Sequence, residues 1–272
     1  MFDCHIHMYT PENDPEKFCR EFFAAGGEEA IIFSPPPPGF TALQQPYSGS
    51  ERLNALNEFC RGRDFLHPFY WVHPLEDDAE EQVRAALAAG VEGFKFICTD
   101  YYPSNPRAMQ LYRIIARHGK CMFFHSGILW DGKASGKYSR PLEFECMLEI
   151  PEVRFALAHV SWPWCDEAIA LYGKFSNAFR TGKSRSEIFL DTTAGTPAIY
   201  RQEVLTKLYT VGYPVEDNLL FGSDNDTTAY DAATVNEWLQ LDRKILTDLQ
   251  LDRQVIDKYF KGNMRRFIVG GK

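Results

Sequence analysis

Short apolar runs recur along the chain, each bounded by turn-forming residues and separated from the next by a stretch with helical spacing. The runs are rich in Phe, Ile, Leu and Val, and most of them lack strict apolar–polar alternation. Continuous apolar runs of this length are typical of parallel strands that are buried on both faces. The eight runs predict strands over residues 2–7, 30–34, 69–73, 93–98, 120–125, 153–159, 187–192 and 218–223.

Stretches with helical spacing of apolar residues lie between these runs. Asp14 followed by Pro15 is typical of a helix N-terminus, and Gly90 and Gly119 are typical of positions just after a helix end. We therefore expect one helix to begin at Asp14–Pro15. Further helices are predicted over residues 77–89, 106–118, 141–148, 165–172, 199–211 and 230–249, with a helical pair over 252–268.

The alternation of strand and helix predicts a parallel sheet, and eight units favour its closure into a (β/α)8 barrel. Because such barrels take about 250 residues, we expect one domain over residues 1–272. An open doubly wound sheet is the alternative, although the chain has no GxGxxG loop. Four longer loops are expected at residues 35–50, 99–105, 126–140 and 173–186, the first of them stiffened by four consecutive prolines.

Composition narrows the classes of partner. The formal net charge of −8 disfavours nucleic acid and anionic membranes, both of which need basic surfaces. The sequence has no secretory leader pattern and no apolar run of membrane-spanning length, so we expect a cytoplasmic protein. The seven cysteines form no CxxC pair and are expected to be free thiols.

Side chains that bind metals follow or end several of the predicted strands. His5 and His7 lie on the first strand, His125 ends the fifth, His159 ends the sixth and Asp224 follows the eighth. In a barrel the carboxyl ends of the strands meet at one face, where active sites are found. Imidazole and carboxylate are ligands of zinc, manganese and iron. The pattern therefore predicts a metal site at this face.

His5 and His7 are two residues apart, so on a strand they point to the same side. If Ile6 faces the helices, both imidazoles face the mouth of the barrel, and Asp3 could support them as a hydrogen-bond acceptor. Taken alone, an HxH pair is as often accidental as functional. The histidines at the ends of other predicted strands, His125 and His159, favour the interpretation as a metal site.

Asp224 and Lys95 each have a functional and a structural interpretation. Asp224 could bind the metal and act as general base towards water, or it could cap the following helix, a task that Asp226 could also perform. Lys95 lies in the apolar segment GFKF, where a buried ammonium is costly. It could be carboxylated and bridge two metals, remain a cation near the substrate, or extend to the barrel rim.

The segments DCHIH, GFKF, FFHSG, LAHVSWPW, LFGSDND and KYFKGNMRRFI, taken together and in this order, resemble the amidohydrolase superfamily. They are most similar to the amidohydrolase-2 group of metal-dependent hydrolases and decarboxylases. The six segments span the whole chain, and their combination is specific, although each segment alone is not.

This resemblance implies roles for individual residues. The metal ligands would be His5, His7, His125 and Asp224, with Asp224 also moving a proton. His159 would polarise the substrate or bind a second metal. Lys95 stands where binuclear relatives carry a carboxylated lysine.

The resemblance also suggests where a substrate would bind. The segment Tyr138–Pro141 is similar to the group's substrate loop, in which Arg140 would bind an anionic substrate. Trp162 and Trp164 would either form an aromatic wall or pack beneath the loops. His73 has no counterpart in the pattern and is expected to be a loop or pocket residue.

The sequence therefore predicts a metal-dependent hydrolase of a small, anionic amide, lactone or ester, with one or two divalent ions per chain. Zinc is favoured, with manganese or iron as alternatives. A non-oxidative decarboxylase of an aromatic or unsaturated acid is the second hypothesis, although such relatives often carry glutamate in place of His5. A sugar-binding barrel without activity is the third. Association into a homo-oligomer through the outer helices is compatible with each.

Overall fold

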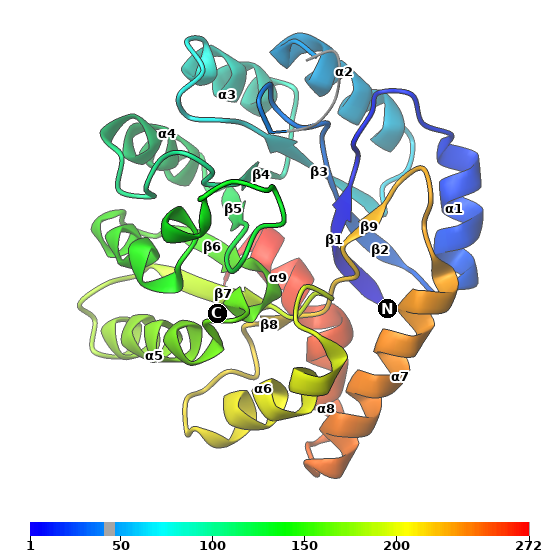
Figure 1. Cartoon of the computed structure of the whole chain (residues 1–272), viewed down its shortest axis with the longest axis vertical. Helices are drawn as coiled ribbons and strands as arrows, with labels where there is room; N and C mark the ends of the chain where they lie inside the picture. Colours follow the sequence, from blue (N-terminus) through cyan, green and yellow to red (C-terminus); the bar gives the residue numbers. More distant parts are fainter. Residues whose placement is uncertain (41–46, 272) are drawn as a thin grey trace.

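A computed structural model of the chain describes residues 1–40 and 47–271. In these ranges the strands form a single parallel sheet that curls on itself, with helices around its outside (Figure 1). The strand order follows the chain from β8 back to β1 and ends at β9. The strands are β1 Phe2–His7, β2 Glu29–Phe33, β3 Leu66–Trp71, β4 Gly93–Phe96, β5 Cys121–Phe124, β6 Arg154–Leu157, β7 Glu187–Asp191, β8 Leu219–Leu220 and β9 Asn225–Asp226.

The eighth position of the barrel is shared by β8 and β9. On one side Thr192 donates its backbone N–H to the carbonyl of Leu220 (3.0 Å), and on the other Asp224 donates its N–H to the carbonyl of His5 (2.9 Å). One continuous segment thus bonds both β7 and β1 and closes the predicted (β/α)8 barrel. The strand predicted over 218–223 is shorter than expected, since β8 ends at Leu220, and the left-handed backbone of Asp224 (φ 59°) directly precedes β9.

The helices occupy the crossovers between strands, and the first begins as predicted. The Asp14 carboxylate accepts hydrogen bonds from the backbone N–H groups of Glu16 and Lys17, and Pro15 occupies the first turn. A 3₁₀ helix, Pro141–Glu149, stands in the fifth crossover. The helices are α1 Pro15–Ala24, α2 Gly49–Cys60, α3 Ala79–Ala88, α4 Pro106–Arg117, α5 Cys165–Arg180, α6 Ala198–Thr210, α7 Ala232–Asp248, α8 Arg253–Asp257 and α9 Asn263–Val269, with a π-helical turn, Lys258–Gly262, between the last two.

One expectation about the crossovers is wrong, and one helix has no counterpart among the predicted elements. Helix α2 was not predicted, although Ser48 and Glu51 form a capping box whose spacing is visible in the sequence. The loop expected at 173–186 is helical as far as Arg180. Helix α5 continues through Gly173, and a Cβ there would lie 2.4 Å from the Tyr213 ring, so glycine at this position serves close packing. Within the loop expected at 35–50, residues 41–46 lie outside the described residues.

The interior of the barrel is packed at one end and open at the other. Phe267 of α9 is fully buried and contacts the rings of Phe69, Phe123 and Phe189 inside the barrel. Helix α9 therefore seals the amino-terminal ends of the strands, and it lies across the middle of the ring in Figure 1. Within the described residues, no helix combines the length and apolar character needed to cross a membrane. The opposite, carboxyl end is the face where the sequence places its metal-binding side chains.

Candidate metal centre

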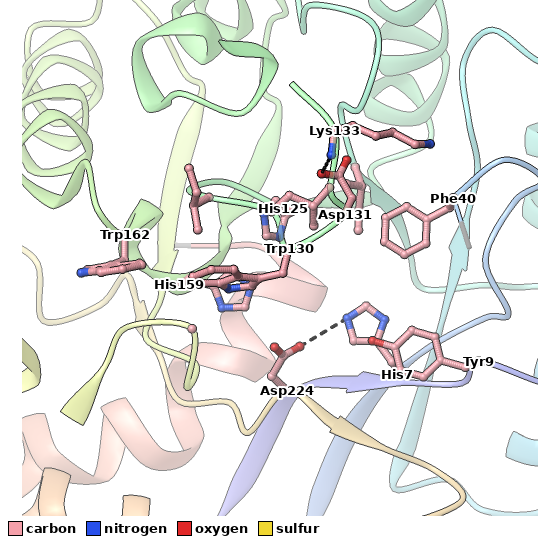
Figure 2. A pocket seen from close by; sticks show the side chains of 14 residues that line it. His7, Tyr9, Phe40, His125, Trp130, Asp131, Lys133, His159, Trp162 and Asp224 are labelled. Atoms are coloured by element: carbon pink, nitrogen blue, oxygen red, sulfur yellow. Dashed lines mark hydrogen bonds and ion pairs between the residues drawn. The ribbon is translucent and has the colours of Figure 1, made fainter. Parts of the chain in front are cut away.

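His5, His7 and Asp224 converge at the carboxyl end of the barrel. His5 Nε2 lies 3.0 Å from His7 Nε2 and 3.3 Å from Asp224 Oδ1, and the third side of the triangle is 3.4 Å. Ile6 packs in the hydrophobic core beneath the helices, so the two imidazoles point inward as predicted. Figure 2 shows Asp224 and His7 facing one another across the base of a cavity.

The spacing and chemistry of this triangle fit a divalent ion. A cation with ligands about 2.1 Å away has ligand-to-ligand edges of about 3.0 Å in octahedral and about 3.4 Å in tetrahedral coordination. The observed edges fall in that range. Two imidazole nitrogens and a carboxylate oxygen are also a donor set that zinc and related ions accept. The three residues therefore fit the metal that the sequence predicts.

The protonation states of these groups suit a cation as well. Burial is the largest cause that lowers the pKa of His5 well below its usual value, and it lowers the pKa of His7 too. Burial raises the pKa of Asp224, but the neighbouring imidazole groups outweigh it and hold that pKa well below its usual range. The imidazoles are therefore neutral and the carboxylate ionised at neutral pH, as metal ligands must be.

A buried carboxylate that sequence reasoning missed orients His5. Asp191, at the end of β7, accepts a hydrogen bond from His5 Nδ1 at 2.9 Å and is fully buried. Thr193 donates both its backbone N–H and its hydroxyl to the same carboxylate. An acidic residue that ends a buried apolar strand was the available signal, as it was for the histidines.

Asp3 does not support the imidazoles as expected. The register of β1 shifts between Asp3 and Ile6, so the carboxylate does not stand in line below the two rings. It accepts instead from the backbone N–H groups of His5 and Ser223 and from the Tyr230 hydroxyl. Asp3 therefore ties β1 to the closing segment.

His125 and His159 lie beside the triangle. Their ring centroids are 5.1 Å apart, and the His159 centroid is 5.2 Å from that of His5. Burial lowers the pKa of both imidazoles. Among the described residues His125 Nε2 has no hydrogen-bond partner although it is buried. A buried nitrogen without a partner is costly, and binding a ligand would relieve that cost.

The backbone that carries His159 is strained. His159, Val160 and Ser161 have left-handed φ values of 59°, 42° and 58°. Such conformations cost on the order of 1–3 kcal/mol each for residues other than glycine and are concentrated at functional sites. Ser126 holds the segment through a 2.7 Å hydrogen bond to the Ser161 hydroxyl, and Thr196 donates to the His159 carbonyl. Loops after three strands thus fix this histidine.

Lys95 of β4 points into the barrel and is completely buried, so it does not extend to the rim. Its Nζ lies 3.3 Å from His5 Nε2 and 4.5 and 5.0 Å from the ring centroids of Phe33 and Phe123. Within residues 1–40 and 47–271, no carboxylate forms an ion pair with it. Burial lowers the pKa of Lys95 to about 8.

A cavity of about 650 Å³ opens above the candidate ligands (Figure 2). His7, His125, His159 and Asp224 line its polar base. The rest of its wall is mainly apolar or aromatic and includes Trp162, which also packs against the hydrophobic core. The apolar and aromatic lining residues are Tyr9, Phe40, Ile97, Ile128, Leu129, Trp130 and Trp162.

The structure does not bring Arg140 to this cavity. The Arg140 guanidinium pairs with Glu167 and lies over the ring of Trp164, and the side chain is 47% exposed. His73, which the sequence set apart from the ligands, bonds to Asp100 at 3.0 Å. The charged groups that line the cavity in addition to Asp224 are Asp131 and Lys133 on the loop after β5.

Comparisons with known proteins give the family and agree with the fold. The model of a family described as amidohydrolase matches residues 2–268. Amidohydrolase 2 from Bifidobacterium longum subsp. infantis is 11% identical, with coverage of 98% of this chain and 97% of that chain and a TM-score of 0.60. Dihydroorotase from Campylobacter jejuni is 12% identical (100% and 83% covered, TM-score 0.60). Adenine deaminase from Arthrobacter aurescens is 15% identical (93% and 75% covered, TM-score 0.51). At these identities the likeness is one of fold. No curated protein sequence matches the chain.

Proposed function

This chain belongs to the amidohydrolase family, and from that premise we propose that it is a hydrolase that cleaves an amide, lactone or ester with water at a divalent metal. The observation that carries the proposal is the convergence of His5 Nε2, His7 Nε2 and Asp224 Oδ1. We assign His125 as a further ligand because its buried Nε2 has no partner among the described residues and its ring lines the cavity. Zinc is the proposed metal, since neutral imidazoles and a carboxylate are its usual ligands.

The chain's own groups divide the work of hydrolysis. A divalent ion held by His5, His7 and Asp224 would supply Lewis acidity, which lowers the pKa of bound water to about 7 and polarises a carbonyl group. The ionised Asp224 carboxylate lies at the polar base of the cavity and accepts the proton of the attacking water. The same carboxyl group then protonates the leaving group. His159, which also lines the cavity, contacts the reacting part of the substrate.

The cavity wall supports a substrate with a flat apolar part. Tyr9, Phe40 and Trp162 offer aromatic faces, and a volume of about 650 Å³ is suited to a small organic molecule. The expectation of an anionic substrate rested on Arg140, which is engaged by Glu167. We therefore propose a small, largely apolar substrate whose polar scissile group reaches the base of the cavity.

Decarboxylation is the competing reaction, because the family comprises hydrolases and decarboxylases and the aromatic wall would also accept an aromatic acid. The presence of His5 rather than glutamate favours hydrolysis. A panel of aryl esters, lactones, anilides and aromatic acids separates the two. We expect release of acid with alcohol or amine, whereas release of CO2 would replace hydrolysis by decarboxylation.

Asp224→Asn is the variant that tests the proposed base. We expect turnover to fall by about 100-fold or more, since a positioned general base contributes about 10²–10⁴. Elemental analysis should still find much of the metal, because the two histidines remain. Asp226→Asn is the matched control, since its carboxylate bonds to Thr228 outside the cavity. Near-normal turnover of Asp224→Asn would remove this residue from the mechanism.

A further inference from the structure

A continuous series of hydrogen bonds joins the rings of His5 and His159 through Asp191, the last residue of β7, and Thr193, which follows it. His5 Nδ1 lies 2.9 Å from Asp191 Oδ2, and Thr193 Oγ1 lies 2.6 Å from the same oxygen. The Thr193 hydroxyl is also 2.7 Å from His159 Nδ1. Asp191 and Thr193 are both fully buried, so solvent does not replace either of them.

The direction of each hydrogen bond follows from the groups present. A carboxylate only accepts, so His5 Nδ1 carries a hydrogen and the Thr193 hydroxyl gives its single hydrogen to Asp191. The hydroxyl then has only lone pairs for His159, so His159 Nδ1 also carries a hydrogen. In each neutral ring the other nitrogen, Nε2, is left with a lone pair.

The two charged neighbours of His5 Nε2 favour opposite assignments. Lys95 Nζ, which can only donate, and Asp224 Oδ1, which can only accept, both lie 3.3 Å from this nitrogen. The shorter bond of 2.9 Å from His5 Nδ1 to Asp191 therefore decides the tautomer. At the other end of this series of hydrogen bonds, the His159 ring packs closely against Gly195, where a Cβ would lie 2.5 Å from His159 Nδ1. Only glycine leaves room for the ring beside Thr193.

The loop that carries Thr193 is anchored from behind. Arg201 of α6 is buried, pairs with Asp242 of α7 and donates to the carbonyl of Thr192. The Thr192 hydroxyl bonds to Leu220 and Tyr259 and so faces away from the histidines. The position of Thr193 is therefore fixed independently of any ligand in the cavity.

We propose that Asp191 and Thr193 are positioning residues that set the ring tautomers of His5 and His159, with hydrogen on Nδ1 and a lone pair on Nε2 in both. In a neutral imidazole, the hydrogen bond made by one ring nitrogen determines whether the other nitrogen carries a lone pair. His5 is thereby prepared to bind a cation. Neutral His159 offers the cavity an acceptor and cannot donate to a substrate oxygen. Only the statement about the cation rests on the proposed function.

Nitrogen-15 NMR of histidine-labelled, chelator-treated full-length protein tests the proposal without substrate or metal. Signals are assigned by their loss in His5→Asn and His159→Asn. We expect the wild type to show the Nδ1–H pattern for both rings. Thr193→Val should give His159 a mixed or Nε2–H pattern and leave His5 unchanged, whereas Thr193→Ser, which keeps the hydroxyl, should retain the wild-type pattern.

Thr192→Val is the matched control, because it removes an equally buried hydroxyl that does not touch His159. It should leave both tautomers unchanged. An Nε2–H pattern for His159 in the wild type, or the same pattern in Thr193→Val and wild type, overturns the assignment even if some variants fold poorly. Absence of hydrolysis in the substrate panel would overturn the proposed function and leave this result unaffected.

Asp191→Asn adds a readout toward the metal. One amide oxygen cannot accept all the hydrogen bonds that the carboxylate accepts, so the His5 ring loses its fixed orientation. Loss of such a partner typically weakens metal binding about 10–100-fold. Titration with Co²⁺, followed by its visible absorption, should find that loss, while Thr192→Val should bind as the wild type does. Equal affinities for Asp191→Asn and wild type contradict the role of Asp191.

Discussion

The two ends of the barrel shift the pKa values of their histidines in opposite directions. At the carboxyl end, burial lowers the pKa values of the candidate metal-centre histidines, and His7 Nδ1 and His125 Nε2 lack partners among the described residues. At the amino end, His67 lies between Glu92 (2.9 Å) and Glu29 (3.4 Å). Burial lowers the pKa of His67, but the two carboxylates outweigh it, so that the pKa is raised.

This difference separates stability from function within one fold. The amino end completes its own contacts: Arg266 pairs with Glu187, and Arg265 pairs with Glu29 beneath the aromatic cluster of Phe267. Among the described residues, the carboxyl end leaves His7 Nδ1 and His125 Nε2 without hydrogen-bond partners and Lys95 without an ion pair to a carboxylate. Such groups cost stability and are retained where something else binds. Each of the following predictions perturbs one end of the barrel and measures the change in stability.

The largest effect is expected at the sealed end. Phe267→Ala removes a fully buried ring from the barrel interior and should lower the free energy of unfolding by about 3–5 kcal/mol. Urea denaturation measures the loss, and Co²⁺ affinity of the folded protein should be unchanged. Val269→Ala, on the same helix but 79% exposed, should change stability by less than about 0.5 kcal/mol. Loss of metal affinity in Phe267→Ala would show that packing at the amino end influences the metal site, contrary to the comparison.

A change of opposite sign is expected at the open end. Lys95→Met replaces a completely buried ammonium, whose nearest groups are His5 and two phenylalanine rings, with an apolar side chain of similar length. The metal-free protein should become more stable by about 2 kcal/mol, since removal of poorly compensated buried charge commonly stabilises. Chemical denaturation of chelator-treated protein measures this gain.

Lys244→Met, which removes a lysine paired only at the surface of α7, is the control and should change stability by less than about 0.5 kcal/mol. We expect Lys95→Met to lose activity despite its higher stability. Destabilisation of Lys95→Met comparable to that of Phe267→Ala would mean that Lys95 is structural, like the charges at the amino end.

The smallest effect concerns His67 and depends on pH. Its folded pKa is raised above the unfolded value of about 6.5, so the stabilisation is complete below that pH and is lost as the pH rises through the folded pKa. His67→Gln should therefore cost up to about 1 kcal/mol at pH 5.5 and less at pH 9. Glu92→Gln, which removes one partner, should show the same trend. A loss of stability in His67→Gln that grows with pH would contradict the proposed stabilisation by protonated His67.

Much of the barrel could be predicted because buried parallel strands are continuous apolar runs. β1 has the predicted limits, and β2 to β7 lie within or close to theirs. Helix α2 begins at a capping box, a signal that is separate from the apolar spacing on which the other helices were predicted. Gly173, where the sequence predicted a loop to begin, lies inside α5 and permits the close approach of Tyr213, a contact that no local pattern contains.

For the site, the sequence by itself determined which side chains reach the carboxyl end of the barrel. An imidazole or carboxylate at the end of a buried strand must lie there whatever the details of packing, and His5, His7 and Asp224 do. Only the tertiary structure decided their partners. Asp191 bonds to His5 across 186 residues of sequence, and Arg140 pairs with Glu167 rather than facing the cavity. Such contacts depend on closure of the barrel and on loop geometry, since a hydrogen bond forms only within a few tenths of an ångström of its ideal length.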